Sequence, residues 1–230
     1  MTSGILSVMK AELRTLCGLL VVALPVHADQ IHEQFPDTID PSGRYVIYSH
    51  GLIVEGENPR PKHPQFGVYD FPGIKQALFA RGGFHLIAHH RPADTEIADY
   101  VATLEQWVRA LIDAGVAPTR ITLVGFSRGA VLTALAASRL EATGVNTALM
   151  AVCANGDLPG DEPVTLGGHF LSIYETTDVV GSCEGLAARS GARVAFDEVA
   201  ISTGRAHGAF YQPLPAWLDP LKAWIERTNR

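Results

Sequence analysis

Short, continuous apolar runs alternate with amphipathic segments along most of this chain, and this alternation limits its fold more than any other feature. The runs are rich in β-branched and aromatic residues and lack the apolar-polar alternation of a half-exposed strand, which is typical of parallel strands covered on both faces. The predicted strands are residues 45–49, 84–89, 121–125, 148–154, 169–174 and 193–199.

The segments between the runs have the 3.6-residue period of helices. The clearest helical stripe consists of Ile97, Val101, Leu104, Val108, Leu111 and Ile112. Asp94 and Thr95 are its candidate N-caps, and Gly115 is expected to end it. The other predicted helices are residues 71–81, 127–141, 180–190 and 214–227. This order predicts a three-layer α/β/α sandwich with a mostly parallel sheet of about six strands, and its ligands are expected at the carboxyl ends of those strands.

The first 28 residues resemble a secretory signal peptide. Lys10 and Arg14 precede an apolar run at 16–26, which ends in the small-x-small pattern Val26-His27-Ala28. The run is too short to cross a membrane, so no stable anchor is expected after cleavage. A buried first helix is the alternative, and Met9 is an alternative start. We therefore divide the chain into a signal peptide (1–28), an extended lead-in (29–44) and one domain (45–230) that is secreted or periplasmic.

Composition excludes several classes of protein. The 230 residues carry a net charge of -6 and no cluster of lysine and arginine, which argues against a nucleic-acid partner. Apolar residues make up 47% of the chain, too many for a disordered protein. The sequence carries no signal of oligomeric state.

Two cysteines remain once the signal peptide, with Cys17, is removed. In an oxidising compartment Cys153 and Cys183 can form one disulfide. Two unpaired buried thiols are the alternative, and the residues by themselves leave both open.

One pentapeptide indicates nucleophilic chemistry. Residues 125–129 read Gly-Phe-Ser-Arg-Gly, the G-x-S-x-G pattern, between an apolar strand and an alanine-rich helix. A tight strand-to-helix turn exposes the serine hydroxyl, and the glycines let neighbouring backbone approach closely. Ser127 is therefore the candidate nucleophile.

A serine nucleophile needs a base and an acid that orients the base, and both are expected on loops after later strands. His207 is the only histidine after the last predicted strand, and Asp178 follows the strand before it. Glu175 and Asp157 are the alternative acids. His207 is thus the candidate base and Asp178 the candidate acid.

An oxyanion hole needs two backbone donors. The residue after the nucleophile, Arg128, provides one, and the loop that begins Ser-His-Gly-Leu after the first predicted strand provides the other. We expect Leu52 to be this donor, with Gly51 as the second choice. His50 is interpreted as a turn residue that packs and hydrogen-bonds locally.

Taken together, the His-Gly loop, the serine turn and the loops of Asp178 and His207 resemble the α/β-hydrolase superfamily over residues 45–227. The resemblance implies an eight-stranded template whose two leading strands are missing here, similar to cutinase-like and small-lipase members. The interval 155–168 has room for a loop only, so no lid domain is expected. Residues 53–70 form a long proline-containing loop and are the candidate flap.

The expected function is that of a serine hydrolase that cleaves small-molecule carboxylic esters through an acyl-enzyme. A thioesterase, amidase or acyltransferase on the same triad is the alternative within enzymes, and a non-catalytic binding module is the alternative outside them. No cofactor is implied. No metal is expected either, because His89 and His90 are neighbours on a strand and point to opposite faces.

Overall fold

The computed structural model describes residues 1, 29–80, 82–159 and 163–230. Apart from Met1, the predicted signal peptide lies outside the described residues. None of the described helices has both the length and the apolar character that crossing a membrane requires.

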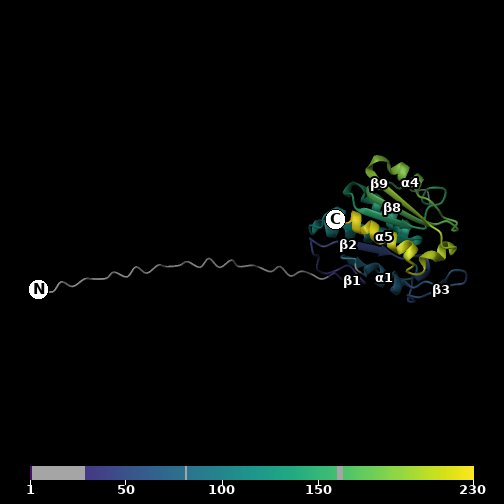
Figure 1. Cartoon of the computed structure of the whole chain (residues 1–230), viewed down its shortest axis with the longest axis horizontal. Coiled ribbons are helices and arrows are strands. Elements are labelled where there is room, and N and C mark those ends of the chain that lie inside the picture. The colour runs from purple at the N-terminus through teal and green to yellow at the C-terminus, as the bar shows by residue number, and fades with distance from the viewer. Residues whose placement is uncertain (2–28, 81, 160–162) are drawn as a thin grey trace.

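A seven-stranded sheet forms the centre of the molecule (Figure 1). In spatial order its strands are β1 (Ile31–His32), β5 (His85–Ile87), β2 (Tyr45–Ser49), β6 (Ile121–Phe126), β7 (Asn146–Met150), β8 (Gly168–Glu175) and β9 (Val194–Ile201). Every pairing in this sheet is parallel. All six predicted strands are present, and the two-residue β1 from the lead-in adds a seventh.

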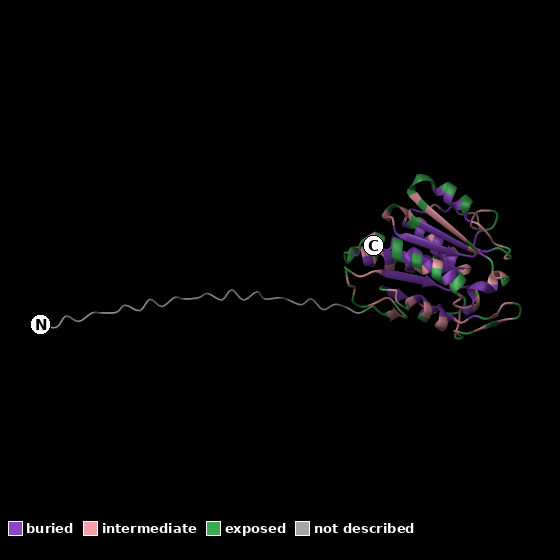
Figure 2. Cartoon of the chain, viewed as in Figure 1, coloured by how far each residue is buried: buried purple, intermediate pink, exposed green. Residues whose placement is uncertain are grey.

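Helices cover both faces of the sheet, which confirms the predicted α/β/α sandwich. They are α1 (Phe71–Phe79), α2 (Ile97–Asp113), α3 (Arg128–Arg139), α4 (Glu184–Ser190) and α5 (Pro215–Thr228). Buried side chains of α1 and α5 pack in one core cluster, and those of α2, α3 and α4 pack in a second one. Successive strand residues alternate between the two clusters, so the central strands are buried on both sides (Figure 2).

Short 3-10 turns connect several of these elements. They are η1 (Leu52–Val54), η2 (Pro118–Arg120), η3 (Glu141–Thr143), η4 (Gly191–Arg193) and η5 (Ala206–Phe210). Two of them, η1 and η5, lie at the carboxyl ends of strands and belong to the candidate site described below.

The predicted N-caps of α2 are wrong. Asp94 has a positive φ of 56°, and the Thr95 hydroxyl donates to the Pro92 carbonyl instead of capping the helix. The helix begins at Ile97, after Glu96, whose side chain makes no capping hydrogen bond. The chain turns once more before α2 begins, and a polar pair followed by an apolar stripe does not reveal that turn.

The segment 53–70 is more ordered than a plain loop. It contains a small antiparallel hairpin of β3 (Lys62–His63) and β4 (Gly67–Val68). Val54 and Tyr69, near its two ends, are fully buried. The segment is therefore anchored in the core at both ends, and only the hairpin between them projects.

Register along the sheet places its functional loops together. Ser49 pairs with Gly125, so the loop after β2 leaves the sheet beside the turn after β6. Likewise Glu175 pairs with Ile201, so the loops after β8 and β9 leave it side by side. All four loops emerge at the carboxyl edge of one parallel sheet, where ligands of such folds bind.

Candidate active site

Ser127 occupies a strained turn between β6 and α3. Its φ of 52° and ψ of -122° are rare for a residue with a side chain. Its N–H donates to the Met150 carbonyl at the end of β7, 3.0 Å away, which helps to hold the turn against the sheet. Backbone strain at a polar residue that ends a strand is typical of a functional position.

Both glycines of the pentapeptide are required by close backbone contacts. A Cβ atom at Gly125 would lie 2.5 Å from the Ala130 Cα, and one at Gly129 would lie 2.1 Å from the Ser49 carbonyl oxygen. No side chain fits at either distance. The glycines therefore let α3 pack closely against β6, the strand before it, and against the loop after β2.

His207 lies between the serine and the acid. Its Nε2 is 2.9 Å from the Ser127 Oγ, and its Nδ1 is 2.7 Å from the Asp178 Oδ2. An ionised carboxylate only accepts hydrogen bonds, so Nδ1 carries the proton. The Nε2 lone pair is then free to accept the serine hydroxyl, which is the arrangement that activates a serine.

Asp178 is well shielded from water. Its side chain is 2% exposed, and the Oδ1 that does not face His207 accepts the Val179 N–H at 2.7 Å. Each carboxylate oxygen thus has a donor, so the carboxylate orients the imidazole from a fixed position.

The two alternative acids are engaged elsewhere. The fully buried Glu175 carboxylate accepts hydrogen bonds from the N–H groups of Thr177, Thr203 and Gly204 and from the Thr177 hydroxyl. Burial raises the pKa of this carboxyl, but the four hydrogen bonds outweigh it and lower the pKa to about 2. Asp157 forms an ion pair with Arg189.

Glu175 links the two loops that carry Asp178 and His207, the candidate acid and base. Thr177 lies directly before Asp178, and Thr203 and Gly204 lie just before His207. One buried carboxylate thus binds backbone donors on both loops, which fixes their separation.

The two expected oxyanion donors start 3-10 turn η1 and helix α3. Neither the Leu52 N–H nor the Arg128 N–H has a hydrogen-bond acceptor among the residues that the structure describes, as expected at the start of a helix. A Cβ atom at Gly51 would lie 3.8 Å from the Ser127 Cβ, so η1 begins beside the serine. Gly51, the second choice as donor, is the N-cap of this turn.

Cys153 and Cys183 are joined by a disulfide. The bond closes a loop of 30 residues that includes Asp178. The Gly181 N–H also donates to the Cys153 carbonyl at 2.9 Å. The acid loop is therefore anchored on both sides, by Glu175 at its start and by the disulfide at its end.

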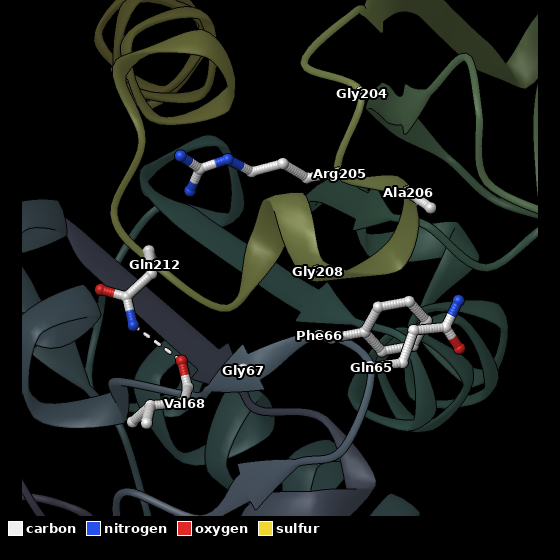
Figure 3. Close-up of a pocket in the computed structure, with 9 residues that line it drawn as sticks. All are labelled: Gln65, Phe66, Gly67, Val68, Gly204, Arg205, Ala206, Gly208 and Gln212. Carbon is white, nitrogen blue, oxygen red and sulfur yellow. Dashed lines mark hydrogen bonds between the residues drawn. The ribbon is translucent and has the colours of Figure 1, made fainter.

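A surface pocket of about 560 Å³ reaches Ala206 and Gly208, the residues before and after His207 in the sequence (Figure 3). The β3–β4 hairpin forms one wall and the η5 turn, which carries His207, forms the other. Its lining residues are Gln65, Phe66, Gly67, Val68, Gly204, Arg205, Ala206, Gly208 and Gln212. The Phe66 and His207 rings are 6.0 Å apart, so the predicted flap is the near wall of this pocket.

His89 and His90 lie on opposite faces of the sheet. His89 stacks on Tyr100 of α2, whereas the His90 Nε2 donates to the Val54 carbonyl at 2.6 Å. The part of the chain that the structure describes contains no group of three or more histidine, cysteine or acidic residues able to hold a metal ion.

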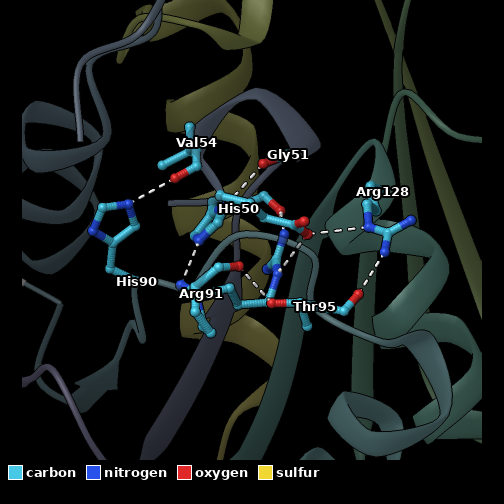
Figure 4. Close-up of polar contacts among 9 residues, drawn as sticks. His50, Gly51, Val54, His90, Arg91, Thr95 and Arg128 are labelled. Atoms are coloured by element: carbon cyan, nitrogen blue, oxygen red, sulfur yellow. Dashed lines mark hydrogen bonds and ion pairs between the residues drawn. The ribbon is translucent and has the colours of Figure 1, made fainter. Parts of the chain in front are cut away.

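Sequence reasoning missed a buried ionic network behind the expected oxyanion donors (Figure 4). Glu55 accepts from the guanidinium groups of Arg91 and Arg128 at 3.2 and 3.0 Å. The Glu55 side chain is 5% exposed and the Arg91 side chain is fully buried. In the sequence these are ordinary charged residues of loops, and no spacing distinguishes them from solvated ones.

Comparison with solved structures shows similar folds at low sequence identity. A hormone-sensitive lipase from a metagenome library has a TM-score of 0.53 and 16% identity, covering 84% of this chain and 80% of its own. A fungal esterase from Rhizomucor miehei has a TM-score of 0.52 and 16% identity, covering 84% and 75%. The Francisella virulence factor BioJ has a TM-score of 0.52 and 11% identity, covering 81% and 77%. No protein-family model and no curated protein matches the chain.

Proposed function

This chain has the α/β-hydrolase fold, and we propose that it is a serine hydrolase that cleaves carboxylic ester bonds. One observation carries the proposal: Ser127, His207 and Asp178 form a continuous hydrogen-bonded series at the carboxyl edge of the sheet. The series comes from three loops far apart in sequence, and its geometry suits a nucleophile, a base and an orienting acid.

In the acylation step, the Ser127 Oγ attacks the carbonyl carbon of the ester while its proton passes to the His207 Nε2. The carbonyl oxygen becomes an oxyanion, which the N–H groups of Leu52 and Arg128 stabilise. Collapse of this tetrahedral intermediate breaks the bond to the alcohol, and the alcohol leaves with the proton from Nε2. Asp178 holds the imidazole in the tautomer that this transfer needs and stabilises the transient imidazolium.

Deacylation repeats these steps with water. The His207 Nε2 takes a proton from the water, whose oxygen attacks the acyl carbon, and then returns a proton to the Ser127 Oγ. The products are a carboxylic acid and the free enzyme. Every group in this cycle belongs to the chain, to the ester or to water, so the proposal includes no cofactor.

We further propose that the protein works in an oxidising compartment, as a secreted or periplasmic enzyme. The predicted signal peptide motivates this, and the Cys153–Cys183 disulfide supports it because such bonds persist mainly outside the cytosol.

Labelling with a fluorophosphonate probe tests the proposal most directly, because the probe reacts only with an activated serine. We expect the wild-type protein to be labelled and S127A to remain unlabelled. A parallel screen of p-nitrophenyl esters of increasing chain length, together with thioester and peptide substrates, is expected to show turnover of the esters. Absence of both labelling and turnover would refute the proposal and favour a binding module, and preference for a thioester or peptide would correct its substrate class.

A further inference from the structure

The two segments that carry the expected oxyanion donors are joined through a single carboxylate. Glu55 lies in the turn that begins with Leu52, because its N–H donates to the Leu52 carbonyl at 2.9 Å. The same residue accepts, through its side chain, the Arg128 guanidinium at 3.0 Å. The Leu52 N–H is therefore in the same turn as Glu55, and the Arg128 N–H belongs to the residue whose side chain Glu55 binds.

The loop of Leu52 is also fixed from behind by Arg91 (Figure 4). The Arg91 backbone N–H donates to the His50 Nε2 at 2.9 Å, its carbonyl accepts the Gly56 N–H at 3.0 Å, and its guanidinium binds both the His50 carbonyl and the Glu55 carboxylate. These contacts hold the loop at both its ends. Because the Arg91 side chain is fully buried, water cannot replace them.

His50 is a neutral part of this frame. Burial and the neighbouring Arg91 guanidinium hold the pKa of its imidazole well below its usual range. Its Nδ1 lies 2.9 Å from the Gly51 carbonyl and donates to it, because Nε2 accepts the Arg91 N–H. Both ring nitrogens are thus used in holding the loop, as expected for a turn residue with no role as a base.

Arg128 is held at two points by its planar fork. Its Nε donates to Glu55 and its Nη2 donates to the Thr95 carbonyl at 2.6 Å (Figure 4). The side chain is 29% exposed, so both hydrogen bonds are partly shielded from water. A guanidinium can make both bonds at once, whereas an ammonium group on a flexible stem cannot match that geometry.

We propose that Glu55 is a positioning residue of the oxyanion hole, because its carboxylate sets the separation of the Leu52 and Arg128 N–H groups. The inference rests on the proposed function. Hydrogen-bond donors in such a hole act only when they lie about 3 Å from the developing oxyanion, so a small change in their separation weakens stabilisation of the transition state.

Because Glu55 is charged, the proposal can be tested by whether replacement of Glu55 raises or lowers kcat. A carboxylate near the oxyanion repels it, so if charge alone mattered, Glu55→Gln would accelerate the reaction. Positioning predicts the opposite, because both guanidinium groups bind one carboxylate oxygen, Oε1, and loss of the negative charge weakens both hydrogen bonds. We expect E55Q to lower kcat about ten- to a hundredfold and to change KM less than about twofold. The hydrogen bonds from the two N–H groups to the oxyanion reach full strength only in the transition state, so their loss affects kcat most.

Phenylboronic acid provides a readout that a merely structural role would not change. The Ser127 Oγ adds to its boron while the hydroxyl proton passes to the His207 Nε2, which gives a tetrahedral anion whose oxygen resembles the oxyanion. We expect E55Q to weaken boronate binding by about the same factor as it lowers kcat. The pH at which activity falls on the acid side should stay unchanged, because Glu55 does not contact His207.

Glu105→Gln is the matched control. Glu105 also accepts from one arginine, Arg109 at 2.8 Å, and lies 3.9 Å from a second, Arg139, but it is a partly exposed residue of α2 and belongs to neither segment that carries an expected donor. We expect E105Q to keep the wild-type kcat and boronate affinity.

Arg128→Lys is the second variant, and it decides the question if E55Q does not fold. It keeps the backbone N–H and the positive charge but loses the fork. Positioning predicts lower kcat and weaker boronate binding for R128K, and values equal to the wild type would overturn the proposal. An active wild type with a folded E55Q of equal or higher kcat, or with a loss confined to KM, would also overturn it. A wild type that is neither labelled nor active refutes instead the proposed function on which it rests.

Discussion

The Asp178 carboxylate and the His207 imidazole, 29 residues apart in the chain, meet in a 2.7 Å hydrogen bond. They meet because each follows one of two neighbouring parallel strands, β8 and β9, which are paired in register up to their last residues. The sheet therefore brings Asp178 to His207, and Glu175, the last residue of β8, binds the backbone of both loops.

Removal of either the nucleophile or the base should nearly abolish turnover. Triad members act as a unit, so we expect S127A and H207A each to lower kcat/KM on p-nitrophenyl acetate by about 10⁴- to 10⁶-fold. Steady-state kinetics measures the effect, and circular dichroism confirms that the variants are folded. A folded H207A that keeps most of the activity contradicts the assignment of the base.

Replacement of Asp178 should lower activity, whereas replacement of Glu175 should lower the stability of the fold. We expect D178N to lower kcat by about 10⁴-fold and to remain folded, because only Asp178 contacts His207. Replacement of Glu175 removes hydrogen bonds from buried donors, so E175Q should lower the free energy of unfolding by on the order of 2 kcal/mol. Kinetics and urea unfolding of both variants separate the two effects. Full activity in D178N together with a catalytic loss in a stable E175Q would reverse the assignment.

Glu175 should also contribute to the acid stability of the fold. Its pKa is lowered from an ordinary value of 4.5 to about 2, so the folded state binds its proton less tightly than the unfolded state does. The stabilisation is complete above pH 4.5 and is lost as the pH falls through about 2. We expect the stability difference between wild type and E175Q to shrink across this interval. Urea unfolding at several acidic pH values measures it, and a constant difference would exclude the ionised carboxylate as its cause.

The disulfide should be present in exported material and should stabilise the fold. Closing a loop of 30 residues is worth about 3 to 4 kcal/mol in the chain-entropy model. We expect a C153S and C183S double variant to unfold at correspondingly lower urea concentration, and mass spectrometry of native protein to find neither thiol free for alkylation. Two alkylatable thiols in protein taken from the export compartment would rule out the bridge.

Turnover should not require a lid to open. The hairpin of β3 and β4 stands beside His207, and its segment is anchored by the buried Val54 and Tyr69. We therefore expect turnover of short water-soluble esters to rise smoothly with concentration. Kinetics across the solubility limit of p-nitrophenyl butyrate measures this. A sharp rise above that limit would indicate that the hairpin moves.

The sequence predicted those parts of the site that depend on local chemistry. Gly125 and Gly129 mark a turn that only glycine permits, and the contacts of both positions explain why. The order of the strands along the chain placed the loops of Asp178 and His207 at one edge of the sheet. The sequence already favoured Asp178 over Glu175 as the candidate acid. The structure adds that Asp178 contacts His207, whereas Glu175, the last residue of β8, binds backbone donors.

Other features were beyond the sequence because they depend on distant contacts. The two residues of β1 become a strand only by pairing with β5, and the lead-in itself has no apolar periodicity. Glu55 and Arg91 belong to loops after different strands, and burial alone distinguishes them from solvated charges. Patterns along a chain report propensity and periodicity, whereas these features come from tertiary packing.

The positive φ of Ser127 lowers the stability of the fold. A side chain in this backbone region costs on the order of 1 to 3 kcal/mol, which glycine largely avoids. Among variants without the hydroxyl, S127G should therefore melt at a higher temperature than S127A. The proposed nucleophile thus stands where selection for stability alone would favour glycine, and a homologue stabilised by glycine at this turn would lack the hydroxyl that the proposed reaction needs.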